Sequence, residues 1–162
     1  MTAELRADDI RDAAVWTLQH LVQLRSGPRP GAAPAPAPDD AAVEVPFWGA
    51  LYGKLMVRAN AELARTIATR LFRAEQPTPR QCQEALCLAA GAICGTMLAP
   101  LRDGRRSCQL ESTRIIDNAK GYERLFGEPR LTAHIGCEQG AAVLRVYLNT
   151  IDAAAGAPSS GG

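Results

Sequence analysis

The chain has 162 residues, a size that suits a single domain able to bury about two-thirds of the surface its unfolded form exposes. Its formal net charge is only +1, so no global field draws it to nucleic acid or to an anionic membrane. The five cysteines include no Cys-x-x-Cys pair and no zinc-like spacing with His20 or His134. We therefore expect reduced, buried thiols, no metal site and no cofactor.

The N-terminal segment is charged and lacks the apolar stretch of a secretory signal, which predicts a cytoplasmic protein. Residues 9–25 repeat apolar side chains with a period near 3.6, and Asp8 or Asp9 stands where an N-cap belongs. Residues 1–25 are thus predicted to form an amphipathic helix of the same domain. His20 lies on its flank without a partner motif and is expected at the boundary of the core.

Residues 26–42 alternate alanine and proline. Proline removes amide donors and favours an extended, solvated chain, so this segment is predicted to be a linker or a long loop outside the core.

Residues 43–59 alternate in polarity and are broken by Gly49 and Gly53, which predicts a strand pair or one bulged strand. Asn60 then stands as an N-cap. The apolar spacing after it predicts an amphipathic helix through residue 72.

A second core helix is predicted to begin at Thr78, with Pro79 in its first turn and Gln81 completing a capping box. It is expected to end near Pro100, where proline interrupts helical hydrogen bonding.

Residues 84–98 of this helix are almost entirely Ala, Gly, Cys and larger apolar residues. Polar and charged residues bracket the segment too closely for a bilayer span, so a membrane dimer built on Gly91 and Gly95 is disfavoured. The favoured interpretation is a core helix packed closely on a sheet, with Gly95 allowing the approach.

Residues 108–116 predict a strand, and residues 131–148 predict a hairpin that turns at 138–140. His134 falls on the face of the hairpin away from the core and is expected at the surface. The core domain is predicted to span 43–152, followed by a frayed tail over 153–162. Strands and helices in separate blocks predict an α+β fold, an antiparallel sheet with two or three helices packed on it.

This order of elements resembles the CheX-like domain of the CheC/CheX/FliY family of chemotaxis phosphatases. The resemblance is carried by "GALYGKLMVR" at 49–58, by the helix that follows it, and by a capped helix ending in "AICG" at 92–95. It covers about residues 43–150. It implies the family's fold and its partner, a CheY-type response regulator whose phospho-aspartate the family hydrolyses.

In that family the second helix carries Glu-x-x-Asn-x-x-x-Gly. The amide orients the attacking water and the carboxylate holds a lysine of the partner. Placing the family's glycine on Gly95 puts Leu88 at the Glu position and Gly91 at the Asn position, with Glu84 one turn earlier. A second register, Glu84-x-x-Cys87-x-x-x-Gly91, also fits the spacing. The Asn is absent from both, so no catalytic residue is expected.

The first hypothesis is therefore a CheX-like protein that binds a receiver domain, or a second copy of itself, without the catalytic pair. Its binding residues would be Glu84, Cys87, Leu88, Gly91 and Gly95, and any Mg²⁺ would belong to the receiver. A basic surface from four arginines is a further candidate, although a solvated helix face is the favoured account of them: Arg58, Arg65, Arg70 and Arg73. The alternatives are an active phosphatase using Glu84 with an amide such as Asn118, and a structural homodimer.

Overall fold

The computed structural model describes residues 4–101 and 108–149, so the tail predicted at 153–162 lies outside the described residues. One antiparallel sheet forms the centre of the molecule, with strands in the order β1-β6-β7-β3-β2-β4 and β5 also paired with β2. The described strands are β1 (Gly27–Pro28), β2 (Ala41–Trp48), β3 (Gly53–Ala59), β4 (Gln109–Leu110), β5 (Arg114–Ile115), β6 (Leu131–Cys137) and β7 (Gly140–Leu148).

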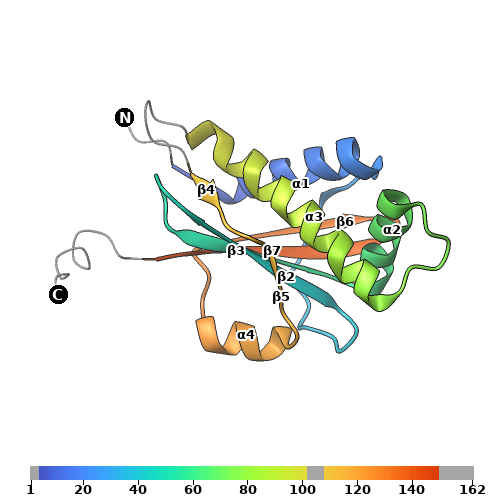
Figure 1. Cartoon of the computed structure of the whole chain (residues 1–162). Coiled ribbons are helices and arrows are strands. Elements are labelled where there is room, and N and C mark those ends of the chain that lie inside the picture. Colours follow the sequence, from blue (N-terminus) through green and yellow to red (C-terminus); the bar gives the residue numbers. More distant parts are fainter. Residues whose placement is uncertain (1–3, 102–107, 150–162) are drawn as a thin grey trace.

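Three helices cover one face of this sheet, and a fourth lies against the other (Figure 1). They are α1 (Ala7–Val22), α2 (Ala61–Phe72) and α3 (Pro79–Leu98), extended by a 3-10 turn at Ala99–Leu101, and, on the opposite face, α4 (Ala119–Phe126). The predicted α+β fold with an antiparallel sheet is confirmed. The strand predicted over 108–116 is two short edge strands, β4 and β5.

Local capping explains where the two core helices begin. The Asn60 side chain accepts a hydrogen bond from the Leu63 amide at 3.1 Å at the start of α2. Thr78 and Gln81 form the predicted reciprocal capping box of α3 at 3.1 and 2.9 Å. The predicted N-cap of α1, Asp8 or Asp9, was wrong by about one turn. Arg6 occupies the N-cap position, and its backbone amide donates to the side chain of Asp9, the third residue of the helix.

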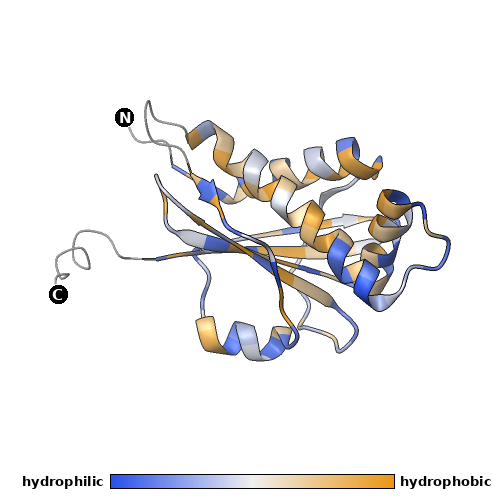
Figure 2. Ribbon diagram, in the orientation of Figure 1, coloured by the Kyte–Doolittle hydropathy of each residue, from blue (hydrophilic) through white to orange (hydrophobic). Residues whose placement is uncertain are grey.

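The strand alternation separates two unlike sheet faces. On the first face, under α1, α2 and α3, the cross-strand rows are apolar. Two of them are Leu131–Val146–Leu55–Val45 and Ala133–Leu144–Val57–Val43, and all of these residues except the partly exposed Leu131 are buried. Figure 2 shows hydrophobic residues recurring along these three helices and along the central strands. The hydrophobic core lies here, between the sheet and the three helices.

The second face is polar and is nevertheless largely covered. Its rows include His134–Val143–Arg58–Ala42 and Thr132–Arg145–Met56–Glu44. Helix α4 lies across part of it, and the chain between β1 and β2 lies across another part, where the Pro34 carbonyl accepts from Arg58 Nη2 at 2.8 Å. We call residues 29–40 the crossing segment.

His134 lies under this crossing segment. Both of its ring nitrogens are buried. Burial and the neighbouring Arg29 guanidinium lower the pKa of His134. The expectation of an open surface position was wrong, because pairing of β1 with β6 brings the following residues over the histidine.

Residues Pro79–Leu101 are long and apolar enough to span a membrane by length and composition alone. Half of the apolar 18-residue window within this segment is buried in the fold, against the sheet and the neighbouring helices. Such burial is what a core helix of a globular domain shows.

Candidate functional site

Helix α3 packs on the first sheet face through a row of small and medium side chains. Its buried residues are Ala85, Leu86, Ala89, Ala90, Ile93, Cys94, Met97 and Leu98. The alanines let the helix backbone approach β2, α1 and α2 closely, which explains the small-residue composition of the segment.

The opposite face of α3 carries all the residues expected at the site. Glu84, Leu88, Gly91 and Gly95 follow one another at helical spacing, so they line one side of the helix, with Cys87 half-buried beside them. The Leu88 side chain is 55% exposed. Glu84 is also exposed and pairs with Arg80, with 3.1 Å between Arg80 Nε and Glu84 Oε1.

The two glycines of this face have open surroundings. A Cβ built on Gly91 would meet only the Thr113 hydroxyl, at 3.7 Å, and one built on Gly95 would meet no described atom within 4 Å. The prediction that Gly95 permits close packing was therefore wrong. The close approach is made by the alanines on the buried face.

The thiols of α3 are held in the neutral form. Burial and the nearby Glu84 carboxylate raise the pKa of Cys87, and burial raises the pKa of Cys94 to about 12. A neutral thiol is a weak hydrogen-bonding group. Cys87 therefore does not replace the amide of the family motif in orienting a water. Among the described residues there is no group of three potential metal ligands.

The proposed basic surface is not assembled. Arg58 is only 3% exposed, and Arg70 Nη1 donates to the Val22 and Gln23 carbonyls at the end of α1, at 3.1 and 2.9 Å. Arg65, Arg70 and Arg73 are exposed, but Arg70 is held at the end of α1, so the four do not form one free basic surface.

The amide considered for an active phosphatase lies elsewhere in the fold. The Asn118 side chain accepts the Gly121 amide at 2.9 Å and so caps α4, on the second sheet face. Glu84 and Asn118 are consequently not brought together.

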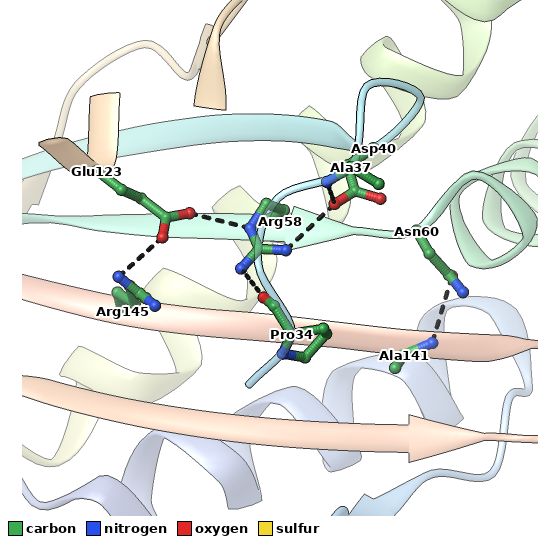
Figure 3. Close-up of polar contacts among 8 residues, drawn as sticks. All are labelled: Pro34, Ala37, Asp40, Arg58, Asn60, Glu123, Ala141 and Arg145. Carbon is green, nitrogen blue, oxygen red and sulfur yellow. Dashed lines mark hydrogen bonds and ion pairs between the residues drawn. The ribbon is translucent and has the colours of Figure 1, made fainter. Parts of the chain in front are cut away.

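A buried charge cluster on the second sheet face was not anticipated from sequence. Arg58 Nε donates to Glu123 at 3.0 Å and its Nη1 to Asp40 at 3.1 Å, while Nη2 donates to the Pro34 carbonyl at 2.8 Å (Figure 3). Arg145 completes the group, with 2.9 Å between its Nη1 and Glu123 Oε1. We call Arg58, Asp40, Glu123 and Arg145 the Arg58 cluster. It ties the crossing segment and α4 to β3.

A second group on the same face centres on Lys54. Its ammonium lies 3.5 Å from Glu44 Oε1 and 2.9 Å from the centre of the Phe126 ring. Burial lowers the pKa of Lys54, and burial with the Glu44 hydrogen bond raises the pKa of Tyr122. The charged residues Glu44, Lys54 and Arg58 within β2 and β3 were the available sequence signal for both groups, because charges in the middle of a sheet need partners when that face is covered.

No family model matches the chain, and no curated protein matches it by sequence. Solved structures do match. A crystal structure of a CheX–CheY–BeF3–Mg²⁺ complex from Borrelia burgdorferi aligns over 90% of this chain and 99% of its own, at 13% identity and a TM-score of 0.65. The chain has the CheX fold.

Two further structures with the CheX fold agree. CheX from Vibrio vulnificus covers 88% of this chain and 95% of its own, at 10% identity and a TM-score of 0.67. CheX from Desulfovibrio desulfuricans covers 88% and 98%, at 15% identity and a TM-score of 0.62. The suspected resemblance is thereby confirmed at the level of the fold, and at such identities the likeness carries no residue roles.

Proposed function

We propose that this protein acts in bacterial chemotaxis or two-component signalling and binds the receiver domain of a CheY-like response regulator through the exposed face of α3, without the phosphatase catalytic pair. The observation that carries the proposal is the position of Leu88 and Gly91. Both lie on the solvent side of α3, in a fold that has been solved in complex with CheY, and neither has a polar side-chain atom.

The exposed face of α3 suits docking better than chemistry. Leu88 is exposed, and the residues that follow it on this face are small: Gly91, Ala92 and Gly95. A large apolar side chain surrounded by small residues can bury area against a partner at little cost in side-chain entropy. The polar groups closest to the motif positions are Glu84, already paired with Arg80, and the Thr113 hydroxyl beside Gly91.

The binding part is tested with CheY-type receiver domains held in the active state by BeF3⁻ and Mg²⁺. We expect a complex with a cognate receiver and a loss of affinity of at least about tenfold for Leu88→Arg, which places a positive charge where the family's carboxylate meets a lysine of the partner. Leu125→Arg is the matched control, because Leu125 is 77% exposed but lies on α4 across the sheet. Equal affinity of both variants would contradict docking on α3.

The catalytic part is tested by following phosphate release from phosphorylated receivers. The native protein is expected to leave the receiver's own rate unchanged. Leu88→Glu with Gly91→Asn rebuilds the family motif at two solvent-side positions, and the Asn side chain has open space beyond the Thr113 contact at 3.7 Å. We expect this double variant to accelerate dephosphorylation at least about tenfold, a modest share of what a positioned catalytic group contributes.

The single variant Cys87→Asn tests the other register, because Glu84 and Gly91 are already in place for it. Acceleration by Cys87→Asn alone would favour that register over the one ending at Gly95. Acceleration by the native protein would instead support the alternative of an active phosphatase of a phospho-aspartate.

A structural homodimer is the remaining alternative. Sedimentation equilibrium of the native protein, with and without receiver, separates the outcomes. A dimer that forms no complex with any activated receiver would contradict the signalling proposal and support the structural one. We propose a cytoplasmic location, where response regulators reside, and neither nucleic acid nor membrane as a partner.

A further inference from the structure

Helices α1 and α3 pack against each other on the first sheet face, so their solvent sides belong to one outer surface (Figure 1). Residues 13–22 of α1 and 85–98 of α3 include no aspartate, glutamate, lysine or arginine, although 22% of the chain is charged. We call the solvent sides of these two stretches the uncharged surface. The solvent side of a helix is normally rich in charged residues, so this surface needs a separate explanation.

Charged side chains lie where these helices begin. Asp8 and Asp12 are 74% and 69% exposed in the first turns of α1, and Arg80 pairs with Glu84 in the first turns of α3. Charges that are depleted at the centre of a surface and present at its margin are typical of protein–protein interfaces.

Trp16 is the most exposed large apolar side chain of α1, at 53%. Its ring is held in place by stacking on the His20 ring, with 4.2 Å between the centroids and 20° between the planes. His20 Nδ1 also lies 2.8 Å from the Trp16 carbonyl oxygen. A tryptophan that is fixed before binding buries a large apolar area and loses little side-chain entropy on association.

Leu88 is the corresponding side chain of α3, at 55% exposure. Each helix therefore presents one prominent apolar side chain, and the other exposed residues of the uncharged surface include the neutral Gln19 and Ala92. A single exposed apolar residue is ordinary on a protein. Two of them on adjacent helices, in stretches without a charged residue, form a patch of the kind that marks an interaction site.

We propose that receiver docking on α3 extends onto α1, with Trp16 as its second apolar anchor. This extension rests on the proposed function, because it assigns the same partner to a larger surface. The partner that fits is a receiver domain whose contact area continues as an apolar, uncharged patch beyond the part that covers Leu88. A charged partner surface would lose its hydration here without an opposite charge to replace it.

The central variant is Trp16→Ala, measured by its Kd for the BeF3⁻-activated CheY-type receiver that binds the native chain. We expect the Kd to rise at least about tenfold, and Trp16→Phe, which keeps an aromatic ring, to raise it less than about threefold. Both variants should unfold close to the native denaturation midpoint, because Trp16 is half exposed and alanine favours a helix.

Trp48→Ala is the matched control. Trp48 is 46% exposed, and because it follows Glu44 by four residues on β2, it belongs to the second sheet face. Its replacement should leave the receiver Kd unchanged.

The two tryptophans also report the contact directly, because the chain has no others. Fluorine NMR of the chain labelled with fluorotryptophan should show the Trp16 signal shifting when unlabelled receiver is added, while the Trp48 signal stays in place. The variant Trp48→Phe assigns the two signals.

The outcomes separate this extension from the proposed function. A complex whose Kd is unchanged in Trp16→Ala, or whose formation shifts only the Trp48 signal, would overturn the extension and leave docking on α3 intact. The absence of a complex with any activated receiver would overturn the proposed function and the extension with it. If Trp16→Ala dissociated a homodimer in sedimentation equilibrium without changing the receiver Kd, the uncharged surface would join two copies of the chain and the extension would be wrong.

Discussion

Arg58→Met tests whether the charge cluster on the second sheet face stabilises the fold. Methionine keeps the length and the apolar stem of the side chain but removes the guanidinium, which is 3% exposed and donates to three oxygens. The consequences differ for the two carboxylates. Glu123 keeps Arg145 at 2.9 Å, whereas Asp40, whose side chain is 7% exposed, keeps only the Ala37 amide at 2.9 Å.

Asp40 therefore becomes a nearly uncompensated buried charge. Removal of one partner from a buried ion pair costs about 3–5 kcal/mol. Because Glu123 remains paired, we expect the lower part of that range, a loss of about 3 kcal/mol in the free energy of unfolding. This is a large share of the stability of a domain of this size.

The measurement is urea denaturation followed by circular dichroism and tryptophan fluorescence. Asp40→Asn alone and together with Arg58→Met completes a double-mutant cycle. The double variant should be more stable than Arg58→Met alone, since it removes the stranded charge. A loss below about 1 kcal/mol in Arg58→Met, or additive effects of the two substitutions, would refute the view that the cluster holds the crossing segment and α4 on the sheet.

Three further predictions follow from other parts of the fold. Gly95→Ala should raise the free energy of unfolding by about 0.5–1 kcal/mol, because Gly95 lies within a helix beside open space. Gly53→Ala should lower the free energy of unfolding by about 1–3 kcal/mol, because the added Cβ would collide with the backbone of β7. Denaturant titrations measure both changes. Burial raises the pKa of Cys94 to about 12, so iodoacetamide at pH 8 should label it only after unfolding, as peptide mass spectrometry can show. Burial lowers the pKa of His134 below its unfolded value of about 6.5, so the unfolded state binds the proton first and stability should fall as the pH drops below about 6.5. Denaturation at pH 5 and pH 8 should show this loss, and His134→Gln should reduce it; an equal loss in the variant would assign the pH dependence elsewhere.

Short-range physics made much of the fold predictable. The Asn60 cap, the Thr78–Gln81 capping box and the period-2 alternation of residues 131–148 each depend on neighbours a few positions away, and each was found as expected. The side-chain face of a helix follows from the same spacing. Glu84, Leu88 and Gly91 were therefore assignable to one side of α3 before the structure was known.

The composition of α3 was predictable, but the reason for its glycines was not. Small residues indicated close packing, and the sequence alone could not distinguish which of them face the sheet. The alanines do so, while Gly91 and Gly95 face open space among the described residues. Which side of α3 packs against the sheet depends on contacts across the whole domain, so a local sequence pattern does not reveal it.

The sequence by itself determined the order of the three helices on the first sheet face and of the long strands, the α+β class, and the absence of Glu and Asn at the positions of Leu88 and Gly91. It gave no sign of β1 or α4. Only the tertiary structure decided the second sheet face. Arg58 meets Glu123 across 65 residues, and Tyr122 meets Glu44 across 78. Their burial and the covering of His134 exist because α4 and the crossing segment come together over strands distant from them in the chain, and no local pattern encodes that meeting.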